Sequence, residues 1–173
     1  TSPNGKLQVI VSDNNGNATY TVSLEGKTMM AASALGLKTN IGDFTQKMTI
    51  EKAETKVIDK QYTMTRTKAS ASHYIANQTV ISLINGNGYP MSITFNVSDN
   101  DVAYRYSLPR GKDNNPKCAV IYSEASSFNF PEQTTTFLCP QSKTMVGWER
   151  TKPSYEEEYK ADAPMTDRSA FGE

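Results

Sequence analysis

The sequence contains few of the residues on which metal sites and nucleophilic catalysis depend. Its 173 residues include two cysteines, one histidine and one tryptophan. With His73 as the single histidine and no CxxC pair, the sequence argues against a zinc site, whose ligands are mostly Cys and His. A Ser-His-Asp triad would need His73 beside a nucleophile, and no G-x-S-x-G elbow is present. We therefore interpret His73 as a strand residue that faces solvent or the sheet.

Net charge and long apolar runs are also lacking. The eighteen basic residues are equal in number to the eighteen acidic ones. Because the chain then has no net positive charge to attract a polyanion, nucleic acid is not an expected partner. No apolar run comes near the roughly 20 residues that a membrane helix needs, so no membrane partner is expected either. Gly86-Asn87-Gly88 lacks the Lys-Ser/Thr pair of a phosphate loop and is interpreted as a hairpin turn.

The two cysteines, Cys118 and Cys139, flank the turn region from Glu124 to Gln133. If the strands on either side fold back on one another, the two sulfur atoms come within disulfide reach. Two buried free thiols are the alternative, because two cysteines do not identify a redox compartment. The sequence leaves both states open.

Short runs of alternating polar and apolar residues, separated by turns rich in Asn, Asp and Gly, dominate the chain. Residues 7–12 and 18–24 alternate with period two, as half-buried strands do. Between these runs, Asn15-Gly16 favours the positive φ angles of a type I′ hairpin turn. Helical signals are scarce, and one turn is expected over Ala31–Leu35.

The clearest β pattern runs from His73 to Leu108. Strands expected over 79–84, 91–97 and 102–108 form an antiparallel meander, and 119–123 and 134–138 read as two more strands. Regular turn spacing of this kind predicts an all-β fold, an antiparallel β-sandwich with little helix. The predicted sandwich domain covers residues 1–152. Residues 153–173 are expected to form an irregular tail with a short helical turn.

Carboxylates are the remaining candidates for chemistry. Glycoside hydrolysis needs two of them, about 5 to 10 Å apart, and the spacing of Glu124, Glu132, Glu149 and residues 156–158 does not select a pair. The three glutamates at 156–158 would repel one another unless they were solvated or bound to a cation, and Ca²⁺ prefers such oxygen ligands. A solvated helix face is the alternative. Trp148 is either a core residue or a platform for stacking on a sugar ring.

Six segments, taken in order, carry a resemblance to a known family. They are Ser2–Val9, Tyr20–Lys27, Ser33–Leu37 leading to Asp43-Phe44, Asp101–Tyr106, Phe128–Pro131 and Tyr155–Tyr159. In this order and spacing they resemble the N-terminal β-super-sandwich of glycoside hydrolase family 97, a bacterial family of α-glucosidases and α-galactosidases. Asp101–Tyr106 is the most distinctive match, and Tyr155–Tyr159 resembles the Tyr-Glu-x-x-Tyr signature of the family.

The resemblance implies a protein that hydrolyses glycosidic bonds in oligosaccharides and is periplasmic or otherwise exported. Its partner would be a catalytic (β/α)₈ barrel of the same polypeptide, outside these 173 residues, and no catalytic residue is expected in this chain. The family site holds a Ca²⁺ ion to which the N-terminal domain contributes one glutamate. By its position in the motif that metal ligand is Glu156, with Glu157 and Glu158 as alternatives.

Two other functions compete with this interpretation. A stand-alone carbohydrate-binding β-sandwich module would expose Trp148 and several tyrosines on one face and bind sugar without a partner domain. A structural or adhesion domain of a surface protein would bind no soluble sugar. A barrel-sized continuation of the reading frame would distinguish the family interpretation from both.

Overall fold

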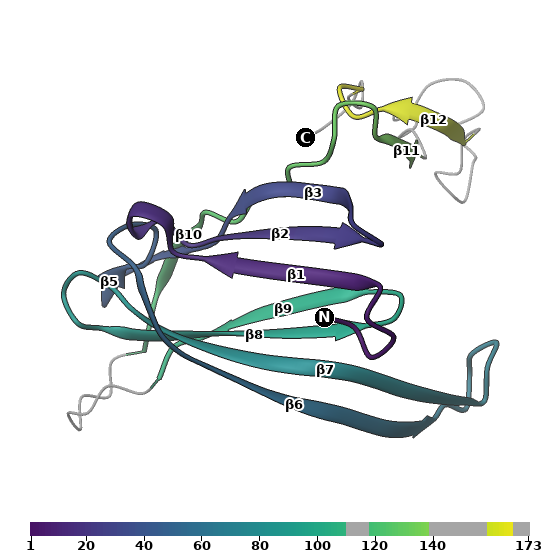
Figure 1. The fold of residues 1–173 in the computed structure, drawn as a ribbon, viewed down its shortest axis with the longest axis horizontal. Helices are drawn as coiled ribbons and strands as arrows, with labels where there is room; N and C mark the ends of the chain where they lie inside the picture. Colours follow the sequence, from purple (N-terminus) through teal and green to yellow (C-terminus); the bar gives the residue numbers. More distant parts are fainter. Residues whose placement is uncertain (110–117, 139–158, 168–173) are drawn as a thin grey trace, which may run out of the picture. The chain divides into compact units, whose positions relative to one another are not determined.

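The computed structural model describes residues 1–109, 118–138 and 159–167. They belong to two compact units, Thr1–Asn129 and Phe130–Glu173. Figure 1 shows that strands dominate, and the one helical element in the described ranges is the short 3-10 turn Asn14–Gly16. None of the described helices is long and apolar enough to cross a membrane.

Three antiparallel strands form the first sheet of the unit Thr1–Asn129. The strands are β1 (Leu7–Ser12), β2 (Thr19–Leu24) and β3 (Lys27–Ala34), in this spatial order. Period-two alternation gives each strand an inner and an outer face. Val9 lies opposite Val22, and Val11 lies opposite Tyr20, so the apolar side chains of β1 and β2 share the inner face.

Four antiparallel strands form the second sheet. They are β6 (Thr49–Thr63), β7 (Ala71–Ile84), β8 (Pro90–Ser98) and β9 (Val102–Ser107), neighbours in sequence order. Along β8, Met91, Ile93, Phe95 and Val97 are buried, as expected for the inner face of a sheet that packs on a second sheet.

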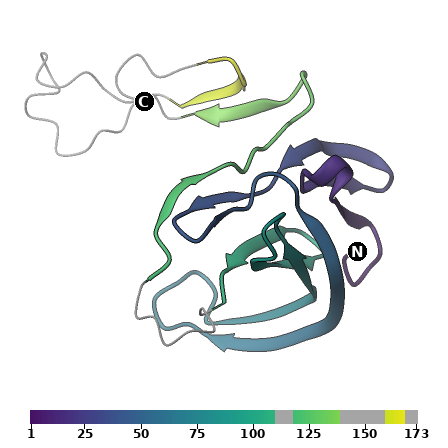
Figure 2. The same ribbon diagram turned by 90° about the vertical axis from the view of Figure 1, so that its left-hand side faces the viewer.

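The inner faces of the two sheets enclose the hydrophobic core, and the sheets lie against each other in both ribbon views (Figures 1 and 2). The core contains buried residues from both sheets and from the connections between them: Leu7, Ala18, Tyr20, Val22, Leu35, Leu37, Phe44, Met48, Ile81, Leu83, Met91, Ile93, Phe95 and Val97. The fold is therefore an all-β antiparallel sandwich, which confirms the predicted fold class.

Two smaller sheets complete the described structure. β4 (Leu37–Thr39) lies between β5 (Gly42–Asp43) and β10 (Ile121–Glu124) in the unit Thr1–Asn129. In the unit Phe130–Glu173, β11 (Thr135–Leu138) pairs antiparallel with β12 (Lys160–Pro164).

The predicted meander is confirmed as β7, β8 and β9, and the strands near 119–123 and 134–138 correspond to β10 and β11. Asn15 and Gly16 have the predicted positive φ angles, 53° and 79°. They lie in a longer connection over residues 13–18, because a 3-10 turn at Asn14–Gly16 separates the two strands.

The helical turn predicted over Ala31–Leu35 is wrong, because residues up to Ala34 belong to β3. Alanine has the highest helix propensity, but propensity is a weak determinant, and here hydrogen bonds on both edges of β3 outweigh it. Strands β6 and β12 were not predicted. The domain boundary predicted at residue 152 lies outside the described residues and stays a prediction, whereas the division between compact units follows Asn129.

Candidate functional site

The segment Ala125–Asn129, which we call the strap, lies along the edge of β3 that does not pair with β2. The backbone N–H of Ser127 donates to the carbonyl of Ala34 at 3.1 Å, and Ala31 N–H donates to the carbonyl of Asn129 at 2.8 Å. An antiparallel bridge joins Ala31 and Asn129. The strap thus covers backbone groups that an open edge would leave for another chain to pair with. It ends where the second compact unit begins, at Phe130.

Side chains reinforce the backbone pairing of the strap. Ser127 Oγ accepts a hydrogen bond from Ala34 N–H at 2.8 Å. Ser33 Oγ accepts from Asn129 N–H at 2.9 Å, and Asn129 Nδ2 donates to the carbonyl of Ala32 at 2.6 Å. Polar backbone groups at a buried edge need such partners. The strap is consequently held at both of its ends.

Two tyrosine hydroxyls reach this region from the core. Tyr20 Oη donates to the carbonyl of Ser127 at 3.1 Å. Tyr106 Oη accepts from Gly36 N–H at 2.9 Å and lies 2.6 Å from Ser126 Oγ. Burial raises the pKa of Tyr20 to about 12, and burial also raises the pKa of Tyr106. Both hydroxyls therefore stay neutral at physiological pH.

A chain of aromatic rings runs from the core to the strap. Tyr104 is its centre, with ring centroids 5.5 Å from Tyr20, 5.4 Å from Phe95 and 5.8 Å from Tyr106. Phe128 of the strap lies 6.4 Å from Tyr104, although more than half of its surface is exposed. Pairs at these distances add to the energy of apolar burial. The strap is thus attached to the core by rings as well as by hydrogen bonds.

The predicted metal ligand Glu156, with its alternatives Glu157 and Glu158, lies outside the described residues, so the metal assignment stays a prediction. The same holds for three further residues that the sequence singled out: Cys139, Trp148 and Glu149. The disulfide between Cys118 and Cys139 therefore also stays a prediction.

The other candidate residues are described, and the structure does not gather them into one site. Glu124 in β10, Glu132 in a turn and Cys118 are all exposed. His73 is an exposed residue of β7, which confirms its interpretation as a strand residue, and its Nε2 lies 2.6 Å from Asp59 Oδ1 of β6. The pairing with Asp59 was not predicted, because β6 itself was not predicted and the contact depends on its register with β7.

The described ranges contain no group of three or more His, Cys, Asp or Glu side chains that could hold a metal ion. Two shallow clefts are present in the unit Thr1–Asn129. One has a polar lining on the outer face of the second sheet that includes Lys60, Gln78, Asn96 and Arg105, and the other has an apolar lining between the two sheets. Neither cleft is lined by Asp or Glu, so neither offers the two carboxylates that glycoside hydrolysis requires.

Comparison with known proteins decides the family. The family model described as glycosyl-hydrolase 97 N-terminal matches residues 1–171. The chain belongs to glycoside hydrolase family 97. The strap includes the start of Phe128–Pro131, one of the segments on which the resemblance to family 97 rested.

At least three known proteins are similar to this family 97 domain. A crystal structure of a β-arabinopyranosidase shares 50% identity, with a TM-score of 0.82, and the match covers 99% of this chain and 27% of that chain. A probable retaining α-galactosidase from Streptomyces bingchenggensis (strain BCW-1) is 27% identical over 136 residues, which is 79% of this chain and 20% of the relative.

The third relative shows likeness of fold. It is a family 97 enzyme from Pseudoalteromonas sp. strain K8 in complex with acarbose, with 23% identity, a TM-score of 0.72 and coverage of 81% of this chain and 22% of that chain. The family 97 chain described here therefore spans between 20% and 27% of the length of these three relatives.

The sequence did not identify the residues that hold the strap, Ser127 and Tyr106 among them. A partial signal existed, because Phe128–Pro131 matched the family pattern. The contacts themselves join residues 107 positions apart for Tyr20 and Ser127 and 70 positions apart for Gly36 and Tyr106. No local pattern encodes partners at such separations.

Proposed function

We propose that this chain is the non-catalytic N-terminal domain of a glycosidase that releases β-arabinopyranosyl or α-galactosyl residues from oligosaccharides. The observation that carries the proposal is the 50% identity with a β-arabinopyranosidase over 99% of the chain. Likeness to a probable retaining α-galactosidase supports the same group of substrates.

The two sugars named by these relatives have a common ring chemistry. β-L-Arabinopyranose and α-D-galactopyranose share the orientation of the anomeric bond and of the hydroxyl groups on the next three ring carbons. Arabinopyranose lacks the hydroxymethyl group, and glucose differs from galactose in the orientation of its fourth hydroxyl. A site that hydrogen-bonds an axial fourth hydroxyl discriminates strongly against a sugar that cannot make this bond. One site can therefore accept both named sugars and reject α-glucosides.

The proposed substrate order is tested on the complete polypeptide that carries this domain. Hydrolysis of p-nitrophenyl β-L-arabinopyranoside, α-D-galactopyranoside and α-D-glucopyranoside is compared through kcat/KM. We expect the arabinopyranoside to be the best substrate and the glucoside to be at least about a hundred-fold poorer, as for loss of a buried hydrogen-bond partner. A preference for the glucoside would contradict the proposal.

The role proposed for the domain is that of a scaffold for a catalytic (β/α)₈ barrel in the same polypeptide. The clefts of the described sandwich have no Asp or Glu in their lining, which supports a location of the catalytic carboxylates elsewhere. The strap supports the role too, because it anchors the chain to the sandwich just before residues 130–173, the range that includes the Glu156 motif.

We further propose that Glu156 is a Ca²⁺ ligand in the complete enzyme. Carboxylate oxygens suit Ca²⁺, which takes six to eight of them, and one glutamate supplies at most two. The described residues contain no acidic group of three that could supply the others, so the remaining ligands would come from outside this part of the domain. A Ca²⁺ ion there would neutralise negative charge and orient substrate hydroxyl groups.

The Ca²⁺ assignment is tested by calorimetric titration of the complete protein. Glu156→Ala is expected to weaken Ca²⁺ binding about ten-fold or more and to lower activity, while the matched variants Glu157→Ala and Glu158→Ala have much smaller effects. If Glu156→Ala binds Ca²⁺ like the parent and a neighbouring variant does not, the assignment moves to that neighbour. Unchanged binding in all three variants would mean that the glutamate run is a solvated face.

Export to the periplasm is the last element of the proposal, and the family resemblance supports it. Osmotic-shock fractionation of the producing bacterium would release the enzyme together with periplasmic marker proteins. Recovery with cytoplasmic markers alone would contradict export.

A further inference from the structure

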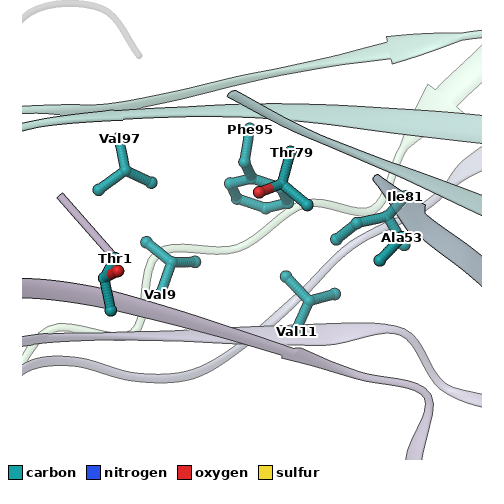
Figure 3. A pocket seen from close by; sticks show the side chains of 8 residues that line it. All are labelled: Thr1, Val9, Val11, Ala53, Thr79, Ile81, Phe95 and Val97. Carbon is teal, nitrogen blue, oxygen red and sulfur yellow. The ribbon is translucent and has the colours of Figure 1, made fainter. Parts of the chain in front are cut away.

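An apolar cleft of about 210 Å³ opens between β1 and the second sheet. In Figure 3, Val9 and Val11 of β1 point across the gap toward Phe95 and Val97 of β8, and Ile81 of β7 closes one side. The lining contains no charged side chain. The volume equals that of about seven water molecules in the liquid, and apolar side chains in their place would remove further apolar surface from water.

β1 is an edge strand that borders the same cleft, and in the described part of the chain no strand pairs with its outer edge. In the described structure β1 pairs with β2 alone. Leu7 N–H donates to Ser2 Oγ at 3.0 Å, and the carbonyl of Leu7 accepts from Ser2 N–H at 2.7 Å, so the polar groups of Leu7 point away from β2. Because these directions alternate along an antiparallel strand, the N–H and C=O groups of Val9 and Val11 also point away from β2. An apolar floor beside such an edge is what an added β-strand requires.

The first two residues already follow this edge. Ser2 is buried and bonds Leu7, and the carbonyl of Thr1 accepts a hydrogen bond from Asn77 Nδ2 of β7 at 2.8 Å. Thr1 itself lines the cleft beside Val9. The chain is therefore directed antiparallel to β1. In a polypeptide that continues before Thr1, the first preceding residue falls opposite Val9 and the third falls opposite Val11.

We propose that, in a polypeptide that continues before Thr1, the preceding residues form an extended segment that pairs antiparallel with β1 and fills the cleft. Directly opposed residues on neighbouring strands point to the same face of a sheet. The side chains one and three positions before Thr1 therefore enter the cleft, and the side chain two positions before Thr1 faces solvent. The inferred pattern is apolar, polar, apolar.

The geometry favours this occupant over a second copy of the chain. Thr1 and Ser2 already occupy the part of the edge beside Leu7. A strand from a second copy would have only the short stretch Val9–Val11 for pairing, whereas a segment continuous with Thr1 arrives in register and loses less entropy on docking.

The test uses two extensions of the 173-residue chain that have the same composition. The in-phase extension, threonine-valine-threonine-valine, places valine one and three positions before Thr1. The out-of-phase extension, valine-threonine-valine-threonine, places threonine there. We expect the in-phase extension to raise Tm by about 3 to 6 °C over the out-of-phase extension, and to slow hydrogen exchange of the Val9 and Val11 amides at least ten-fold.

Three results would overturn the proposal. Equal Tm and equal exchange in the two extended chains would show that the cleft does not accept a strand in this register. A higher Tm for the out-of-phase extension would place the opposite face in the cleft. A dimer of the unextended chain in sedimentation, with slow exchange at Val9 and Val11, would assign the edge to a second copy.

Discussion

Gly36 has a backbone conformation that favours glycine, lies close to Phe44 and forms hydrogen bonds with Tyr106 and with Ala125 of the strap. Its φ angle is +154°, and a Cβ atom placed on it would lie 2.6 Å from the carbonyl oxygen of Phe44. Its N–H donates to Tyr106 Oη at 2.9 Å, and its carbonyl accepts from Ala125 N–H at 2.9 Å. Any side chain at this position would push Gly36 away from Phe44 and Thr45 and so disturb the two hydrogen bonds that Gly36 makes with Tyr106 and Ala125.

Gly36→Ala is therefore expected to destabilise the chain by about 2 to 4 kcal/mol, since the clash adds to backbone strain. Gly88→Ala is the matched control, because Gly88 has a φ angle of +78° with open space around its Cβ position, and its cost should be about 1 kcal/mol. Urea unfolding of both variants measures the difference. Equal losses would show that the contact with Phe44 has no effect.

Tyr20 makes the free energy of unfolding decrease as the pH becomes alkaline. Burial raises its pKa to about 12, whereas an unfolded tyrosine ionises near pH 10. Its contribution is fully present below about pH 10 and is lost as pH rises toward about 12, because the unfolded chain releases this proton first. The free energy of unfolding should fall by about 1 kcal/mol per pH unit near pH 11 from this group.

Urea unfolding at pH 9 and at pH 11 checks the effect of Tyr20. In Tyr20→Phe the fall between the two pH values should be smaller than in the parent chain, although Tyr106 still contributes in the same direction. An unchanged pH dependence in Tyr20→Phe would contradict the assignment.

At the scale of the elements, β8, which has a clearly buried face, could be predicted, and β6, which is exposed along almost its whole length, could not. β8 alternates between buried apolar residues and partly exposed polar ones, so its sequence alone shows the sheet. β6 is exposed along nearly all of its 15 residues and carries charged residues such as Lys52, Glu54 and Lys56, which hide the alternation. It is a strand because it pairs with β7 along its length. The second half of β3 was mistaken for helix because its apolar residues are all alanines, and alanine is the residue with the highest helix propensity.

The candidate site could be predicted only in part from the sequence. The sequence of the strap was recognised only through family resemblance, because its partners are far away along the chain. Ser127 Oγ, for example, bonds the N–H of Ala34 93 positions earlier. The candidate metal ligand Glu156 depended on the motif alone, and the described residues supply no contact that places it.

Ser127→Ala should loosen the strap locally. Ala34 N–H loses its 2.8 Å bond to Ser127 Oγ, and an amide without its partner costs about 1 to 3 kcal/mol. Hydrogen exchange at Ala34 should accelerate at least about ten-fold, as expected for a loss above 1.4 kcal/mol. Ser70→Ala is the control, since Ser70 is exposed and contributes its carbonyl to Met64 N–H. Equal exchange at Ala34 in both variants would show that the side chain of Ser127 does not hold the strap.

At the scale of the whole molecule, the unit Thr1–Asn129 is a two-sheet β-sandwich in the residues that the structure describes. Its core joins two sheets, its two described clefts lack carboxylates in their linings, and its strap is bonded along β3 as far as Asn129. The chain with these features belongs to glycoside hydrolase family 97, whose N-terminal family model it matches.

The most direct test of this account is the activity of the purified 173-residue chain on p-nitrophenyl β-L-arabinopyranoside and α-D-galactopyranoside. The chain should release p-nitrophenol no faster than buffer does, because glycoside hydrolysis needs two positioned carboxylates, while the complete polypeptide hydrolyses at least one of the two substrates. Turnover that survives repurification, and that Glu124→Gln, Glu132→Gln or Glu156→Gln abolishes, would contradict the account by placing catalysis within this domain.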